Sequence, residues 1–297
     1  MDHGRRAMPA AAWRAAGRSP SRATRSENVS CGCCAFAAQG ASALVLLALA
    51  SGCAPQFGPN ARNGITFYCP GAGNIDFGDT GLREGLQEAG YQGDIATFVW
   101  TISLNPAIDQ TLRLNARLRA SQLADIIADY IDRYPGRPVH LVGLSAGTGV
   151  AIWALEDLKS RYRVDNVVLL SSSLSHDYDV SKALRHVRGK IYNYYSSEDP
   201  VLTLLMKPFG TIDGKLLADA AGAVGLHPRR GAERVVNTAW RPEYQKYGYY
   251  GHHTDATNPR FVQAVLSRHI IEPQPVVRRE TAPATAQRSA LLAASRD

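Results

Sequence analysis

Five short apolar runs alternate along the chain with segments of helical periodicity, and this alternation limits the possible folds more than any other feature. The runs are apolar at both odd and even positions, which is typical of strands buried on both faces of a parallel sheet. Parallel strands need crossover connections, usually helices on both faces. The sequence therefore predicts an α/β fold with a mainly parallel, doubly wound sheet. The expected strands are Ile65–Cys69, Ile95–Trp100, Val139–Leu144, Val167–Leu170 and Ile191–Tyr195.

The segments between these runs carry helix signals. Apolar side chains from Leu123 to Ile131 follow the spacing of an amphipathic helix, which Pro135 and Gly136 would end. Other helices are expected at Gly81–Ala89, Thr148–Tyr162 and Pro259–His269. The predicted folded domain thus spans residues 65–272. A disordered tail is expected over 273–297, because this segment is rich in Pro, Ala, Thr and Arg.

The N-terminal 52 residues have the composition of a signal peptide with a basic extension. Residues 34–50 carry no charge and follow a segment that contains six arginines. The end of the apolar stretch, Leu49 to Cys53, resembles the lipobox of bacterial lipoproteins. That resemblance implies lipidation of Cys53 and an exported, membrane-anchored lipoprotein of the bacterial cell envelope. An uncleaved N-terminal membrane anchor is the alternative, and residues 53–64 are expected to link either anchor to the domain.

The net charge of +7 does not indicate a nucleic-acid partner, because it is concentrated in the terminal segments. Residues 1–52 carry +4 and residues 273–297 carry +2, so the domain and linker between them carry only +1. No basic stripe forms there. The cysteines do not indicate a disulfide either. Once the signal peptide is removed and the anchor cysteine carries lipid, Cys69 would be the one cysteine left with a free thiol. We expect Cys69 to be a buried thiol within its apolar run.

The segment GLSAG, residues 143–147, places Ser145 between a buried strand and a helix. Such a strand-turn-helix is the context in which G-x-S-x-G acts as a nucleophile elbow. The turn brings strand and helix so close that side chains at Gly143 and Gly147 would clash. It also sets Ser145 near a helix N-terminus, where the amide of Ala146 can stabilise an oxyanion.

A serine nucleophile needs a histidine as base and a carboxylate that orients it. Asp199 follows the aromatic-rich strand at 191–195 and therefore lies at the same sheet edge as Ser145, with Glu198 as the competing acid. His252 is the preferred base because Gly251 allows close approach, and His253 is the alternative. His140 lies inside a predicted strand and is interpreted as a core histidine. A metal site at this histidine loop is disfavoured, because adjacent histidines rarely point at one ion.

The chain order Ser145, Asp199, His252 is similar to that of the α/β-hydrolase superfamily, which the sequence resembles from Ile65 to about Ile271. The resemblance implies a minimal α/β-hydrolase fold without a large cap, since only about twenty residues separate the last two predicted strands. It also implies that the loop YCPGAGN supplies a second oxyanion donor, the amide of Ala72 or Gly73. A dinucleotide site is excluded, because Asp76 stands where the third glycine is required.

The sequence therefore predicts a serine hydrolase that cleaves an ester-like acyl bond through an acyl-enzyme and needs no cofactor or metal. Its expected partners are a small-molecule or lipid-like acyl substrate and, through the lipid anchor, a membrane. Two alternatives stay open: an acyltransferase with the same residues, and a non-catalytic envelope binding module. Residues 201–250 are expected to shape the substrate pocket, but they do not identify the acyl group.

Overall fold

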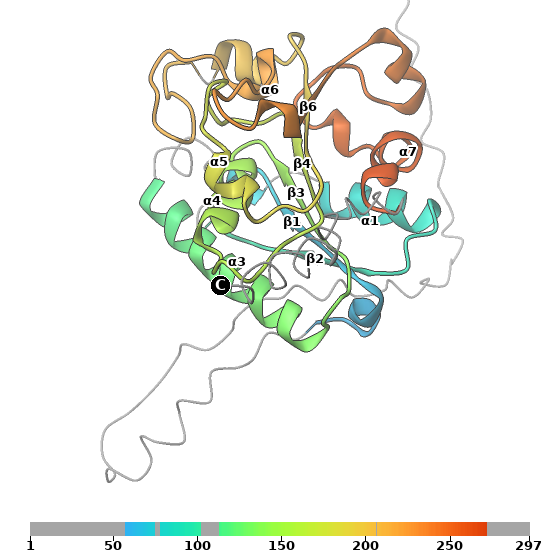
Figure 1. Cartoon of the computed structure of the whole chain (residues 1–297). Coiled ribbons are helices and arrows are strands. Elements are labelled where there is room, and N and C mark those ends of the chain that lie inside the picture. The colour runs from blue at the N-terminus through green and yellow to red at the C-terminus, as the bar shows by residue number, and fades with distance from the viewer. Residues whose placement is uncertain (1–56, 75–77, 102–112, 206, 272–297) are drawn as a thin grey trace, which may run out of the picture.

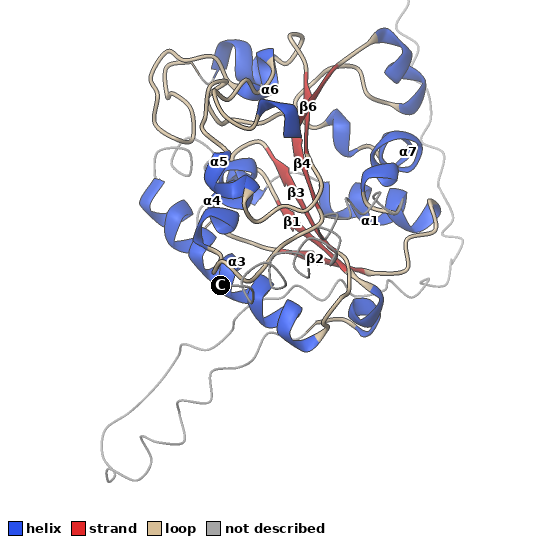
Figure 2. Cartoon of the chain, in the orientation of Figure 1, coloured by secondary structure: helices blue, strands red, loops and turns tan. Residues whose placement is uncertain are grey.

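The computed structural model describes residues 57–74, 78–101, 113–205 and 207–271. These residues form a six-stranded, all-parallel sheet with the strand order β2-β1-β3-β4-β5-β6. Figure 2 shows the strands as a twisted central layer. The strands are β1 (Ile65–Cys69), β2 (Asp94–Thr97), β3 (Val139–Leu144), β4 (Asn166–Leu170), β5 (Ile191–Tyr195) and β6 (Val235–Ala239).

Helices cover both faces of this sheet, as Figure 1 shows. Helices α3, α4 and α5 lie on one face, and α1 and α7 lie on the other. The α-helices are α1 (Gly78–Glu88), α3 (Arg113–Arg133), α4 (Gly147–Asp157), α5 (Ser181–Leu184), α6 (Ala221–Val224) and α7 (Pro259–Phe261). The 3-10 helices are η1 (Pro59–Asn63), η2 (Ala72–Asn74), η4 (Ala232–Arg234), η5 (Pro242–Tyr247), η6 (Asp255–Thr257) and η8 (Ser267–His269), and the π-helical turns are η3 (Val201–Leu205) and η7 (Val262–Leu266).

The core lies in two layers that follow from the alternation of side chains along each strand. In β3, for example, Leu141 packs with α3 and α4, whereas Val142 and Leu144 pack with α1 and α7. All six residues of β3 are buried. Strands buried on both faces are mostly apolar at odd and even positions alike, which explains why the central strands could be recognised as apolar runs.

Three of the five predicted strands, β1, β3 and β5, have the bounds expected from the sequence. β2 ends earlier than predicted, and Trp100 instead donates its indole N–H to the carbonyl oxygen of Pro70 at 2.8 Å. β6 was not predicted. It is an edge strand, four of its residues are half-buried and Ala239 is exposed, so it lacks a continuous apolar run.

The segment before β1 differs from the linker expected over residues 53–64. Residues 59–63 form η1, Ala61 is fully buried, and the hydroxyl of Tyr130 donates to the Ala61 carbonyl oxygen at 2.6 Å. This part of the expected linker therefore belongs to the packed domain. The predicted signal peptide, Cys53 and the C-terminal tail lie outside the described residues. None of the helices in the described part of the chain is both long and apolar enough to cross a membrane.

The β4–β5 connection, residues 171–190, contains one short helix, α5, so no cap domain is inserted at this point. The parallel sheet, the helices on both faces and the sharp β3–α4 turn together are the minimal α/β-hydrolase fold that the sequence predicted. Because every strand is parallel, all the loops that follow strands meet at one edge of the sheet.

Candidate active site

Ser145 occupies the turn between the end of β3 at Leu144 and the start of α4 at Gly147. Its backbone φ is 53°, in the left-handed region that residues other than glycine seldom adopt. Four hydrogen bonds hold this backbone. The Ser145 N–H donates to the Leu170 carbonyl oxygen at 3.0 Å, and the Ser145 carbonyl oxygen accepts from the Ser173 N–H at 3.3 Å and from the N–H and hydroxyl of Thr148 at 3.1 and 2.5 Å. The half-buried serine is thus fixed at the carboxyl edge of the sheet.

The two glycines of the elbow are required by close packing. A Cβ atom at Gly147 would collide with the backbone carbonyl oxygens of Cys69 and Pro70, at the end of β1 and just after it. A Cβ atom at Gly143 would lie 2.8 Å from Cα of Thr148 in α4. Both approaches are much closer than an ordinary van der Waals contact, so this turn requires glycine on each side of the serine.

Backbone amides at the same edge can serve as oxyanion donors. Ala146 immediately precedes α4, and the first N–H groups of a helix have no acceptor within the helix. Ala72 lies in η2, in the loop that follows β1, and the start of this loop packs against Gly147. The indole of Trp100 holds the loop through its hydrogen bond to Pro70. The two amides therefore come from loops that contact each other beside Ser145.

Asp199 is fully buried after β5, and both of its carboxylate oxygens have partners. Oδ1 accepts hydrogen bonds from the N–H groups of Val201 at 3.0 Å and Leu202 at 3.2 Å. Oδ2 lies 2.7 Å from Nδ1 of His253. The carboxylate is therefore held by the backbone and engages one ring nitrogen of the histidine, so that Nε2 is the nitrogen not used by Asp199.

The geometry corrects the preference for His252. Its side chain is 64% exposed, and Nδ1 lies 3.3 Å from Oδ2 of Asp255, not near Asp199. Asp255 also accepts the N–H of His252 at 3.1 Å, so a carboxylate three residues ahead holds this histidine locally. The sequence contained that signal, because an aspartate at this spacing can bind the first histidine and leave His253 to reach across to β5.

Gly251 lets its loop pack closely against the segment after β5, as expected, but the histidine that this packing brings to Asp199 is His253. Its φ is 96°, and a Cβ atom there would lie 2.9 Å from Oγ of Ser196, which precedes Asp199 by three residues. The competing acid Glu198 is exposed and forms no hydrogen bond or ion pair with either histidine. The two histidines face different carboxylates, and no group of three potential metal ligands exists among the described residues.

Two other titratable side chains are buried in the core, as the sequence predicted. Burial lowers the pKa of His140 to about 4, so this histidine is neutral near pH 7, and the charge of Asp165 opposes the shift. Burial raises the pKa of the Cys69 thiol far above its ordinary value. Neither group can therefore act as a base or a nucleophile at the sheet edge.

Ser173 was not singled out from the sequence, although its backbone contacts Ser145. It belongs to the polar run at 171–175, SSSLS, which follows the buried strand β4. The side chains of Ser171 and Ser173 are buried, and neither hydroxyl has a hydrogen-bond partner in the structure. A serine-rich run placed directly after a buried parallel strand was the available signal, because such residues reach the same edge as the elbow.

Comparisons with known proteins show the following similarities. Residues 84–220 match a family described as "Protein of unknown function (DUF726)". No curated protein matches the sequence. Among solved structures, lipase B of Aspergillus fumigatus is 14% identical with a TM-score of 0.47, and the match covers 73% of this chain and 55% of that one. This chain thus spans about half the length of that lipase.

Two further solved structures give similar values. The esterase Pf2001 of Pyrococcus furiosus is 11% identical with a TM-score of 0.44, and the match covers 71% of this chain and 83% of the esterase. The carboxylesterase CesB of Bacillus subtilis is 10% identical with a TM-score of 0.37, with 71% and 85% covered. The α/β-hydrolase fold of the chain rests on its own parallel sheet, the helices on both faces and the sharp β3–α4 turn.

Proposed function

We propose that this protein is a serine hydrolase that cleaves an ester-like acyl bond, with Ser145 as nucleophile, His253 as base and Asp199 as the orienting acid. The observation that carries the proposal is the 2.7 Å contact between Nδ1 of His253 and Oδ2 of the fully buried Asp199. A carboxylate in this position favours the tautomer whose Nε2 can accept the serine proton. The positive φ of Ser145, in a turn flanked by required glycines, is the second support.

The reaction has two halves. Oγ of Ser145 attacks the carbonyl carbon of the ester while its proton passes to Nε2 of His253, and the amides of Ala146 and Ala72 stabilise the oxyanion. The bond from carbon to the alcohol oxygen then breaks, and the alcohol leaves with the proton from His253. Water attacks the acyl-serine in the second half and gives a proton to His253. The bond from the acyl carbon to Oγ of Ser145 then breaks, His253 returns the proton to Oγ, and the acid departs.

A fluorophosphonate probe tests this proposal on the full chain in detergent. The probe should form a covalent adduct at Ser145, located by mass spectrometry, and the Ser145→Ala variant should not react. Thermal unfolding of both proteins serves as the folding control. A folded wild type that stays unlabelled would contradict the proposal and favour a binding module. Product analysis with water and an added alcohol then distinguishes a hydrolase from an acyltransferase.

Attachment to the cell envelope remains part of the proposal. It is supported by the apolar stretch at 34–50 and by the lipobox-like segment that ends at Cys53. A fatty-acid analogue supplied to bacterial cells that express the full chain should be incorporated into the wild type and not into a Cys53→Ser variant. Equal incorporation into both proteins, or none into the wild type, would contradict lipidation at Cys53.

A further inference from the structure

The loop that carries His253, residues 248–254, connects η5 to η6 and packs closely against two other elements. A Cβ atom at Gly251 would lie 2.9 Å from Oγ of Ser196, in the segment that follows β5. The same atom would lie 3.2 Å from Cδ2 of Trp240, in the indole ring that follows β6. Because His253 is only two residues further along the chain, the packing of Gly251 bears directly on where the imidazole lies.

Trp240 is fixed at the carboxyl edge of the sheet by its own backbone. It directly follows the last residue of β6, Ala239, which pairs with Tyr195 at the end of β5. The N–H of Trp240 donates to the carbonyl oxygen of Tyr195 at 2.7 Å. The indole therefore projects from a fixed point on the edge that also bears Asp199.

The indole N–H of Trp240 donates to the carbonyl oxygen of Tyr249 in the histidine loop at 2.9 Å. Tyr249 is fully buried, and its ring lies among those of Tyr244 and Phe261. Its side chain thus holds the loop to the core, while its carbonyl group is held by the indole. Trp240 contacts the loop at two points, through its N–H at Tyr249 and through its ring at Gly251.

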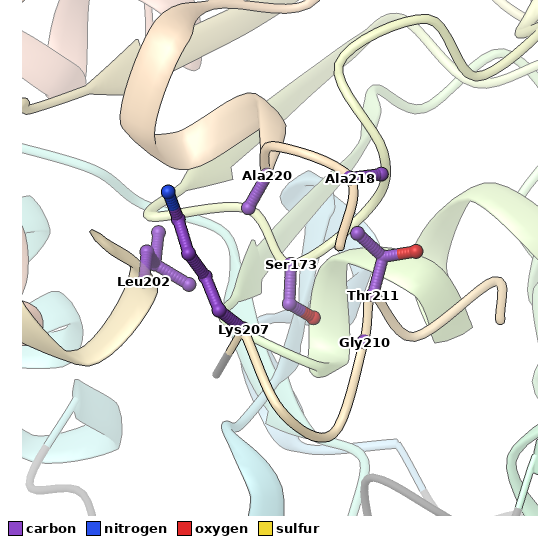
Figure 3. A pocket seen from close by; sticks show the side chains of 7 residues that line it. All are labelled: Ser173, Leu202, Lys207, Gly210, Thr211, Ala218 and Ala220. Carbon is purple, nitrogen blue, oxygen red and sulfur yellow. The ribbon is translucent and has the colours of Figure 1, made fainter. Parts of the chain in front are cut away.

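The other partner of the imidazole, Asp199, is held by a different segment. The N–H of Leu202 donates to Oδ1 of Asp199 at 3.2 Å. Leu202 is buried and packs with Ala220, and Figure 3 shows these two side chains. Because the acid has its own support, the 2.7 Å contact between its Oδ2 and Nδ1 of His253 depends on the position of the histidine loop.

We propose that Trp240 is a positioning residue for the base: its indole N–H, through the Tyr249 carbonyl oxygen, holds the loop so that Nδ1 of His253 meets Asp199. The inference rests on the proposed function and adds to it a residue that acts through His253. Without the indole N–H, the Tyr249 carbonyl oxygen loses a partner that a phenyl ring cannot replace. The loop then shifts, and even a displacement of about 1 Å at a catalytic group can slow a reaction about a hundredfold.

The Trp240→Phe variant tests this inference on the full-length protein in detergent, because phenylalanine keeps an aromatic ring and lacks the N–H. The kcat for a nitrophenyl ester should fall about tenfold, since other contacts still hold the loop in part. KM should stay within about twofold of the wild type, as expected when a group acts only in the transition state. In the His253→Ala background the same substitution should cause no further loss, because the base that it positions is absent.

A spectroscopic measurement reports on the contact without catalysis. An imidazole N–H bonded to a carboxylate gives a proton resonance far downfield of the amides, and its absence from His253→Ala assigns it to this histidine. We expect the resonance in the wild type. In Trp240→Phe it should shift or disappear, because Nδ1 of His253 no longer meets Asp199 in the same geometry.

Trp153 provides a matched control. It is buried in α4, and its indole N–H donates to the hydroxyl of Tyr178, in the β4–β5 connection, at 2.9 Å. Trp153→Phe removes an equivalent bond and should keep both the histidine resonance and a kcat within about twofold of the wild type. Benzothienylalanine at position 240 has sulfur in place of the ring N–H at nearly the same size. It should repeat the Trp240→Phe result without altering the packing, and thermal unfolding confirms that each variant is folded.

Three results would overturn the inference: equal losses of kcat in the two phenylalanine variants, a wild-type kcat in Trp240→Phe, or a full tenfold loss in the His253→Ala background. Fluorophosphonate labelling distinguishes this inference from the proposed function. A labelled Ser145 with a histidine resonance that is insensitive to Trp240 refutes only the role of Trp240. An unlabelled and inactive wild type whose resonance still depends on Trp240 refutes the hydrolase and retains the role of Trp240 in placing His253.

Discussion

Nδ1 of His253 lies 2.7 Å from Oδ2 of Asp199, whereas the adjacent His252 turns outward to Asp255. Because the two histidines are neighbours with opposite surroundings, they form a natural pair for mutation. The His253→Ala variant should lose on the order of 10²–10⁴-fold in kcat with an activated ester, the range expected when a general base is removed. His252→Ala should stay within about threefold of the wild type, as an exposed residue outside the proton path does. The reverse ranking in steady-state assays would show that the loop rearranges before catalysis.

The two neighbouring acids allow a second comparison. Asp199→Asn keeps the shape of the side chain but removes the charge that stabilises the imidazolium, so kcat should fall on the order of 10³–10⁴-fold. Glu198→Gln alters an exposed side chain and should leave kcat unchanged. Rate measurements across pH 5–9 check the result, with circular dichroism to confirm folding. Comparable losses in the two variants would contradict the assignment of Asp199.

Gly147 should be intolerant of a side chain. The Gly147→Ala variant places a methyl group against the carbonyl oxygens of Cys69 and Pro70, which belong to backbone that cannot rotate away. We expect the free energy of unfolding to decrease by about 1–3 kcal/mol, as is typical of overpacking. Urea unfolding measures this change. Gly136→Ala is a useful comparison, since nothing lies within 4 Å of a Cβ atom there and only its φ of 77° opposes the substitution.

Thiol reagents should leave the activity intact. Cys69 is fully buried in β1, and burial raises the pKa of its thiol, so the reactive thiolate is scarce at neutral pH. Iodoacetamide should therefore alkylate Cys69 only after denaturation, as peptide mapping of native and unfolded protein can establish. Inactivation that accompanies modification of Cys69 in the native protein would contradict the burial described above.

His140 should make the fold sensitive to acid. Its pKa of about 4 in the folded state lies below the ordinary value of 6.5, so between these limits the unfolded chain binds more protons. The free energy of unfolding should therefore fall as pH drops from 6.5 toward 4, and this residue should account for a loss on the order of 2 kcal/mol between pH 7 and pH 5. The His140→Leu variant removes the titrating group, so it should show a correspondingly smaller loss in urea titrations at the two pH values. Equal losses in both proteins would exclude His140 as the cause.

The sequence predicted the centre of the fold better than its periphery. β1, β3 and β5 could be located because strands buried on both faces are mostly apolar, whereas β6 at the sheet edge carries no such run. The positions of Ser145 and Asp199 followed from the rule that parallel strands end at one edge. Which histidine reaches Asp199 depends on the path of a loop and could not be predicted. Asp255 binds His252 locally, and this leaves His253 to contact Asp199.

The surroundings of the proposed active site could be predicted only in part. Residues 201–250 were expected to shape the substrate pocket, and this stays a prediction. The position of Ser173 could not be predicted from the sequence, because it depends on how the chain around Ile212 folds back over the end of β4. The N–H of Ile212, which donates to the Ser173 carbonyl oxygen at 2.9 Å, makes that long-range connection.

Asp199 ties the position of the segment after β5 to the alignment of the proposed base. One of its oxygens is held by the amides of Val201 and Leu202, and the other by His253. Any shift of the backbone at Leu202 will therefore tilt the carboxylate and, with it, the imidazole. Substitutions that repack this segment should carry a cost in turnover, and variants that restore speed should map to the backbone between Asp199 and Leu202.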